Sequence, residues 1–428
     1  MQQRHKKDVQ ILPLAIIFIY NDIFDSEPAM TDSLNFRHLL AALEIRKSGS
    51  ISAATEPMFL SQSAITQALS KLEKTLGHRL FTRTSKGLYP TEVGEVFLQR
   101  IERAVHWLTL LDSLFPAKGK GNPRIYRRIS TAQLTALVTV VDYGNYSLAA
   151  AHLSLTQPTL HRAIRELEGL CGRSFFQRSP SGVEPNWQSR QAARYASLYF
   201  SELAQGIDEV EEYVGNIIGS LRVGSLPLAR TRIAPKAVTQ LLEEFPSARI
   251  NIVDGPYQEQ LDMLRHGRLD LIIGALRNPA PSSGIDQQTL FTDSLHIVVR
   301  PGHPIARQKS ISVLKLQELQ WIAPSENAPA RAAFTKFFEA RGLQPPEHVI
   351  ECSSLIATRG LLLESNRAAL LSKRQVEIEV ASDLLAVSPM KLSGMRRDIG
   401  ITTRSNWKPT KLQSRFIDLL YSQFRIDH

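Results

Sequence analysis

The chain has few cysteines and only one short stretch that resembles a membrane or export segment. Its two cysteines, Cys171 and Cys352, exclude a disulfide framework and a cysteine zinc site, which favours a reducing, cytoplasmic setting. The apolar stretch Ile11–Tyr20 follows basic residues, as in a signal peptide, but it is too short to span a bilayer and a good cleavage site is missing. We interpret residues 1–29 as a leader from a start placed too far upstream, and we expect no membrane association.

The sequence also lacks the common signatures of catalysis and metal binding. Its 11 histidines include no HExxH pattern, and no glycine-rich phosphate-binding loop is present. We therefore expect a protein that is not an enzyme and that uses no cofactor and no metal. The 428 residues suggest about three domains, and the formal net charge of +10 suits a polyanionic partner without proving one.

The first half of the chain repeats itself at an interval of 95 residues. Residues 39–90 align with residues 134–185 without a gap, and 15 of the 52 positions are identical. The identities include turn glycines, a leucine–glutamate pair and an arginine in the last third of each copy. Such an even register predicts a duplicated domain.

Each copy is predicted to fold as three short helices followed by a β-hairpin. In the second copy, apolar residues at helical spacing end at Gly144, which is a typical helix stop. Ser147 is expected to cap the next helix, at 148–153, and Thr156 is expected to cap the third, at 158–170. Ser61 is expected to cap 63–76 in the first copy in the same way.

The second and third helices of each copy form a helix-turn-helix pattern, in which the polar face of the later helix enters a DNA major groove. Glutamine suits an adenine edge, arginine a guanine edge, and serine or threonine either, while basic hairpin residues reach phosphates. The alternative is a merely solvated helix face, which the matched glutamine and arginine of the two copies disfavour. The candidate DNA-binding residues are Gln62, Ser63, Thr66, Gln67, Arg83 and Lys86 in the first copy, and Gln157, Pro158, His161, Arg162 and Arg178 in the second.

Each copy resembles the winged helix-turn-helix domain of LysR-type transcriptional regulators. The resemblance lies in Gly49–Ala54, Leu60–Thr66 and Leu80–Arg83, and in Leu155–Leu160 of the second copy. The second copy has the family's Gln–Pro pair at the start of the recognition helix, whereas the first has Ser63 in place of the proline. A usual family member has one such domain. We predict that both copies contact DNA. A second possibility is that the first copy has become a protein-contact or dimerisation module.

From residue 219 onward, strands alternate with helices, which predicts an α/β fold with ligands at the carboxyl ends of strands. Gly219–Gly224, Leu264–Asp270 and His303–Ala306 resemble the LysR-type effector domain, which has two lobes like periplasmic solute-binding proteins. The resemblance implies a carboxylate or sugar-like effector between the lobes. Arg230 would pair with a carboxylate. The alternative is that Arg230 is a surface charge and that Ser225 and Ser353 are only helix caps. The candidate effector-binding residues are Ser225, Arg230, Thr231, Gly274, Ser353 and Ser354.

We therefore expect a mixed fold, with two all-α-rich winged helix-turn-helix domains followed by a two-lobed α/β effector domain. The expected segments are the leader at 1–29, a first domain with its helix at 30–116, a basic linker at 117–128, a second domain at 129–189, a linker or dimerisation helix at 190–218 and the effector domain at 219–428. The long helix after each copy carries an apolar stripe that suits pairing of two subunits, but packing back on its own domain would give the same spacing. The expected partners are double-stranded DNA, a small-molecule effector, further copies of the chain as a homodimer or larger assembly, and RNA polymerase. The alternative is a small-molecule-binding protein or enzyme on a solute-binding fold, with the N-terminal domains serving oligomerisation.

Overall fold

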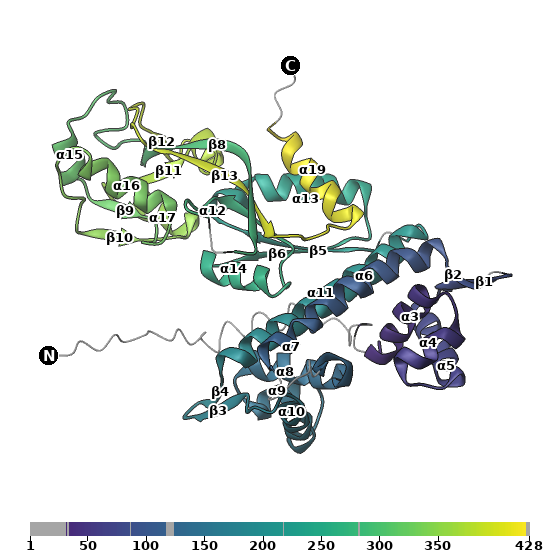
Figure 1. Cartoon of the computed structure of the whole chain (residues 1–428). Coiled ribbons are helices and arrows are strands. Elements are labelled where there is room, and N and C mark those ends of the chain that lie inside the picture. The colour runs from purple at the N-terminus through teal and green to yellow at the C-terminus, as the bar shows by residue number, and fades with distance from the viewer. Residues whose placement is uncertain are drawn as a thin grey trace. The chain divides into compact units, whose positions relative to one another are not determined.

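The computed structural model describes residues 31, 34–85, 87–116, 124–216, 218–280 and 283–424. These residues divide into two compact units, with the boundary between Gly219 and Ser220 (Figure 1). The leader at 1–29, Lys86 and residues 117–123 of the basic linker lie outside the described residues. No helix in the described ranges is long and apolar enough to cross a membrane.

The first repeat copy folds as three helices, a hairpin and a long helix. Its elements are α3 (Phe36–Ser48), α4 (Ile51–Met58), α5 (Gln62–Leu76), β1 (Phe81–Thr84), β2 (Gly87–Pro90), α6 (Glu92–Thr109) and the short α7 (Leu111–Leu114). Ser61 caps α5 as predicted, because its side chain accepts a hydrogen bond from the amide of Ala64. Gly49 ends α3 in the left-handed region, at a φ of 72°, which glycine adopts without steric cost.

The second copy repeats this order of elements. They are η1 (Ile125–Arg128), α8 (Thr131–Tyr143), α9 (Tyr146–His152), α10 (Gln157–Cys171), β3 (Phe176–Ser179), β4 (Gly182–Pro185) and α11 (Trp187–Tyr213). Thr156 caps α10 as predicted. The predicted cap of α9 was wrong, because Asn145 and not Ser147 occupies that position. The Asn145 side chain accepts from the amides of Ser147 and Leu148, so Ser147 already lies in the first turn.

The end of the expected linker is part of the folded unit. Ile125 is buried, and its amide donates to the Asp112 carboxylate at 2.7 Å. Residues 125–128 therefore form a docked 3-10 helix and do not belong to a free tether.

Helices α6 and α11 pack against each other in antiparallel orientation (Figure 1). Tyr213, at the end of α11, donates to Glu92 at the start of α6, and Tyr195 near the start of α11 stacks on Trp107 near the end of α6. The apolar stripes of both helices belong to one continuous core that also includes the three-helix parts of both copies. The stripe that was expected to join two subunits is thus covered within the chain.

The second unit is built on a mixed nine-stranded sheet with the order β10-β9-β11-β8-β13-β7-β5-β6, and β12 also pairs with β8. The strands are β5 (Ser220–Ser225), β6 (Arg249–Asp254), β7 (Leu271–Ala275), β8 (Ile285–Val299), β9 (Trp321–Ala323), β10 (Val349–Glu351), β11 (Ala368–Ser372), β12 (Ala386–Val387) and β13 (Arg396–Arg404). The helices are α12 (Pro227–Thr231), α13 (Ile233–Glu244), α14 (Tyr257–Arg265), α15 (Val313–Glu318), α16 (Pro329–Glu339), α17 (Leu355–Leu363), α18 (Glu377–Ala381) and α19 (Lys411–Ser422).

Strand β8 connects the two lobes of this unit. It pairs with β13 along Ile285–Ser294 and with β11 along Leu295–Val298. In the first lobe β5 runs parallel to β6 and β7, and in the second β9 runs parallel to β10 and β11. Each lobe therefore presents the carboxyl ends of a small set of parallel strands, where α/β folds place their ligands.

Candidate functional sites

The predicted recognition residues of the first copy share the exposed face of α5. Ile65, Leu69 and Leu72 on the opposite face are buried, so the amphipathic spacing sets which side chains face outward. Thr66 donates its hydroxyl to the Gln62 carbonyl at 2.9 Å, as threonine often does within a helix. The predicted residues exposed on this face are Gln62, Ser63, Thr66 and Gln67.

The second copy presents a more basic face on α10. Gln157, Pro158 and Arg162 are exposed, and the Arg162 side chain lies 3.9 Å from Glu166 one turn later. His161 is half-buried because its ring stacks on Tyr146 of α9, with ring centroids 3.8 Å apart and an interplanar angle of 16°. The stack holds the imidazole in a defined orientation at the start of α10.

The hairpins are anchored to the helices by identical contacts in the two copies. The Glu73 carboxylate accepts from the amide of Leu80 at 2.8 Å, and Glu168 accepts from the amide of Phe175 at 2.6 Å. The repeated leucine–glutamate pair therefore fixes each hairpin to its recognition helix. Arg83 and Arg178 are exposed at matching positions of β1 and β3, and Lys86 lies outside the described residues.

The repeated glycines bring the second strand of each hairpin against the residue that ends the first helix of the copy, α3 or α8. The amide of Leu88 donates to the Gly49 carbonyl at 2.9 Å, and the amide of Val183 donates to the Gly144 carbonyl at 2.8 Å. A Cβ on Gly182 would lie only 2.3 Å from that carbonyl oxygen, so only glycine fits there. Packing of the hairpin against the end of the first helix therefore explains these identities of the repeat.

In the second unit, three of the predicted effector residues meet where β5 ends. Ser225 is fully buried, and its hydroxyl has no hydrogen-bond partner among the described residues. The Arg230 Nε donates to the Ser225 carbonyl at 2.9 Å, and its Nη1 lies 3.4 Å from Asp254 at the end of β6. Burial lowers the pKa of Arg230, and Asp254 counteracts part of this effect. The Thr231 hydroxyl donates to the Leu228 carbonyl.

The other predicted effector residues have structural roles or lie apart. A Cβ on Gly274 would lie 2.5 Å from the Leu226 Cβ, so this glycine allows β7 to approach the loop after β5. Ser354 caps α17 by accepting from the amide of Ala357, and Ser353 is exposed beside it. Within the described ranges, no hydrogen bond or ion pair joins these two serines to the residues at the end of β5.

Sequence reasoning missed a cluster of arginines next to this site. The Arg277 guanidinium lies 3.9 Å from the centre of the Tyr257 ring, and burial lowers its pKa, with Tyr257 opposing and Arg397 adding to that effect. Arg397 is paired with Asp293 at 3.1 Å, and Asp293 also accepts from Ser372. The Tyr257 hydroxyl is buried without a hydrogen-bond partner among the described residues. Arg277 follows β7, so the rule that ligands lie at strand carboxyl ends could have identified it.

The chain matches two family models over most of its length. The model "Bacterial regulatory helix-turn-helix protein, lysR family" matches twice, at residues 36–95 and at residues 131–190. The model "LysR substrate binding domain" matches residues 215–425. The two helix-turn-helix matches coincide with the two repeat copies described above.

Similar proteins are named transcriptional regulators. The HTH-type transcriptional regulator GalR of Pseudomonas putida is 31% identical over 371 residues, which cover 87% of this chain and 92% of that relative. The HTH-type transcriptional regulator PcaQ of Agrobacterium fabrum is 29% identical over 285 residues, or 66% of this chain and 91% of that relative.

Among solved structures, the LysR family transcriptional regulator CbnR has the same fold with a TM-score of 0.50 at 18% identity, covering 69% of this chain and 99% of that chain. A full-length OxyR variant from Pseudomonas aeruginosa has a TM-score of 0.51 at 22% identity, covering 69% of this chain and 94% of that chain. With helix-turn-helix and substrate-binding matches on one chain, this protein belongs to the LysR-type transcriptional regulators, which combine a DNA-binding helix-turn-helix domain with an effector-binding substrate domain.

Proposed function

We propose that both winged helix-turn-helix copies of this duplicated chain read DNA, and that a carboxylate or sugar-like effector bound by the C-terminal unit controls the outcome. The observation that carries the proposal is that both copies expose the same face of the recognition helix beside a hairpin arginine. The chain would act in the cytoplasm as a regulator and not as an enzyme, in a homodimer or larger assembly, with RNA polymerase as a further partner.

The two recognition helices offer different chemistry to the bases. On α5, Gln62 and Gln67 carry amides that suit adenine edges, and Ser63 and Thr66 carry hydroxyls that suit several bases. On α10, Gln157 repeats the amide and Arg162 adds a guanidinium that suits guanine, while Pro158 and His161 shape the start of the helix. Arg83, Lys86 and Arg178 on the hairpins would contact phosphates.

Alanine substitution of one reader in each copy tests this proposal. Arg162→Ala and Gln67→Ala should each weaken binding to the gene's own upstream DNA by about 1–3 kcal/mol. The exposed Arg173 beyond α10 and the exposed Gln99 on α6 provide matched controls, Arg173→Ala and Gln99→Ala, which should leave affinity unchanged. A loss at Arg162 without any loss at Gln67 would restrict DNA reading to the second copy.

The effector site that the chemistry favours lies at the carboxyl ends of the first-lobe strands. Arg230 and Arg277 are two half-buried guanidiniums there, and the hydroxyls of Ser225 and Tyr257 are buried polar groups without hydrogen-bond partners among the described residues. Buried polar groups are normally satisfied, so a ligand that accepts and donates hydrogen bonds suits them. Gly274 would keep β7 close to this group, and Thr231, Ser353 and Ser354 are second-rank candidates that would line the site from α12 and from the other lobe.

A thermal-shift screen with aromatic carboxylates, sugar acids and neutral sugars tests the effector site. A compound that raises the melting temperature of the full chain should lose its effect in Arg277→Met. The matched control is Arg249→Met, because the exposed Arg249 lies at the amino end of β6, at the opposite edge of the sheet. An equal shift in the wild type and in Arg277→Met would remove this arginine from the site.

A further inference from the structure

Helices α6 and α11 occupy equivalent places in the two repeat copies, yet their contact is not symmetric. Adding 95 to a residue number in the first copy gives its equivalent in the second, so Arg100 corresponds to Tyr195 and Trp107 to Glu202. If two identical helices paired in antiparallel orientation, each contact would occur twice, once toward each end. In this pair, the two halves on either side of the centre are formed by side chains of different kinds.

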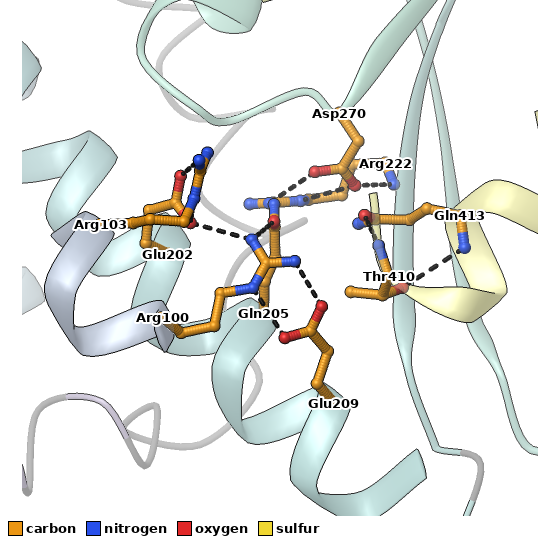
Figure 2. Close-up of polar contacts among 9 residues, drawn as sticks. All are labelled: Arg100, Arg103, Glu202, Gln205, Glu209, Arg222, Asp270, Thr410 and Gln413. Atoms are coloured by element: carbon orange, nitrogen blue, oxygen red, sulfur yellow. Dashed lines mark hydrogen bonds and ion pairs between the residues drawn. The ribbon is translucent and has the colours of Figure 1, made fainter. Parts of the chain in front are cut away.

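One half of the helix pair, on one side of its centre, holds a buried ionic cluster (Figure 2). The Arg100 side chain is 3% exposed and donates to Glu202 at 2.9 Å, to Gln205 at 3.0 Å and to Glu209 at 2.8 Å. Arg103 also pairs with Glu202, at 2.9 Å. The buried guanidinium thus has acceptors at Glu202, Gln205 and Glu209, on successive turns of α11 in the second copy.

The other half of the helix pair is held by an aromatic contact. Trp107 and Tyr195 stack with ring centroids 6.4 Å apart and an interplanar angle of 23°. These two residues are the repeat equivalents of Glu202 and Arg100, which form the ion pair in the first half. Each of these two repeat positions therefore carries a charged side chain in one copy and an aromatic ring in the other: Arg100 corresponds to Tyr195, and Glu202 corresponds to Trp107.

This asymmetry penalises the pairing of like domains. Two first copies would place Arg100 opposite Trp107, leaving a buried guanidinium without a carboxylate. Two second copies would place Glu202 opposite Tyr195, leaving buried carboxylates without an arginine. Breaking a buried ion pair by removing one partner is strongly unfavourable. Shape adds to the penalty, because a Cβ on Gly206 would lie 2.8 Å from the Arg100 Cβ, and the repeat equivalent of this glycine is Leu111.

We propose that the two DNA-binding domains of one chain pair with each other through α6 and α11, so that a single chain is a complete two-headed reader of two unlike half-sites. The inference that the two domains pair within the chain rests only on two contacts, Arg100–Glu202 and Trp107–Tyr195. The reading of unlike half-sites rests in addition on the proposed DNA binding by both copies, because α5 offers amides and hydroxyls where α10 offers His161 and Arg162.

Photo-crosslinking of the full chain tests the pairing without DNA or effector. The aromatic photo-crosslinker p-benzoylphenylalanine replaces Trp107, which is half-buried against Tyr195. Protein labelled with ¹⁵N is mixed with separately prepared unlabelled protein, and the mixture is denatured and refolded to allow exchange of chains. It is then irradiated and digested. Mass spectrometry identifies the joined peptides and their isotopic composition. The same crosslinker in place of the exposed Tyr89 on β2 is the control.

The expected product joins position 107 to an α11 peptide that contains Tyr195, and both peptides carry the same isotopic label. Mixed-label α6–α11 products would mean that the domains pair between chains, and α6–α6 products would mean that like domains pair. Either of these results overturns the proposal. The Tyr89 control should give no product with α11.

The second part is tested on DNA. Once a footprint defines the two half-sites, one half-site is replaced by a copy of the other, in the orientation that makes the site palindromic. We expect affinity to fall about 5- to 150-fold, as for loss of one to a few base contacts. Equal affinity for the palindromic site would overturn the proposal that the two half-sites are unlike. The crosslinks would still report whether the two domains pair. Absence of any specific DNA binding would instead remove the proposed function and leave the crosslinking result untouched.

Discussion

The ring of Tyr146 lies flat against His161, with centroids 3.8 Å apart, and ties α9 to the recognition helix α10. The first copy has Ile51 and Thr66 at the equivalent positions. Replacing Tyr146 by Ile and His161 by Thr therefore introduces the other copy's own residues. A double-mutant cycle of unfolding free energies should show a coupling of about 0.5–1.5 kcal/mol, the usual value of an aromatic pair. Additive effects of the two substitutions would contradict a stabilising stack.

Arg100 on α6 and Arg46 on α3 provide a comparison between a buried and a half-exposed ion pair. Arg100→Met leaves Glu202 buried and Glu209 half-buried with one partner removed, and should destabilise the first unit by about 3–5 kcal/mol. The Arg46 side chain is 28% exposed and pairs with Glu95 and Glu102 within the first copy, so Arg46→Met should cost at most about 1 kcal/mol. Hydrogen exchange of α6 and α11 peptides measures both, and similar protection in the two variants would argue against the ionic cluster as the stronger contact.

The ionic cluster predicts how the first unit responds to acid. Burial favours a raised pKa for Glu202, but Arg103 and Arg100 together outweigh it and hold the pKa below the ordinary 4.5. A lowered folded-state pKa gives stability that is present above pH 4.5 and is lost as the pH falls through the folded-state value. Glu202→Gln should therefore be less stable than the wild type at pH 7, and the difference should shrink below pH 4.5. Unfolding measured from pH 3 to pH 7 tests the trend, and a constant difference would contradict it.

Two helical glycines with opposite surroundings test the packing of α6 on α11. A Cβ on Gly206 would lie 2.8 Å from the Arg100 Cβ and 3.1 Å from Phe97, so Gly206→Ala should separate the helices and cost about 1–3 kcal/mol. Gly169 in α10 has nothing within 4 Å of the same position, so Gly169→Ala should stabilise by about 0.5–1 kcal/mol through helix propensity. Thermal unfolding of the two variants should move in opposite directions.

The two cysteines should differ in reactivity. Burial, with the negative charges of Asp112 and Glu168, raises the pKa of the Cys171 thiol to about 12. At pH 8 its reactive thiolate is then rarer than that of an ordinary thiol by roughly a factor of 10³. Iodoacetamide should label Cys352 in the native protein and leave Cys171 unmodified until the chain is unfolded. The Cys352→Ser variant isolates the slow thiol, and rapid labelling of that variant would contradict burial of Cys171.

Much of the first unit could be predicted because local signals agree in both copies. Ser61 and Thr156 cap their helices as expected, and the spacing of apolar residues places Gln67 and Arg162 on exposed faces. The cap of α9 was mispredicted because asparagine and serine both favour N-cap positions and stand two residues apart. The effector residues were harder to predict, because a strand's carboxyl end defines a region and not a side-chain direction. Arg277 lies in such a region, after β7, but was not singled out there, and Gly274, which was singled out, serves packing.

The sequence by itself determined the repeat, the helix-turn-helix pattern, the alternation of strands and helices from residue 219 onward and the family, since all of these depend on residue types at fixed local spacing. It also showed that α6 and α11 carry apolar stripes. Which surfaces those stripes cover was decided only by the tertiary structure, because any apolar stripe can be buried by the same chain or by another one. The burial of Arg100 among Glu202, Gln205 and Glu209, more than one hundred residues away, and the stacking of Trp107 on Tyr195 are long-range contacts that local spacing does not encode.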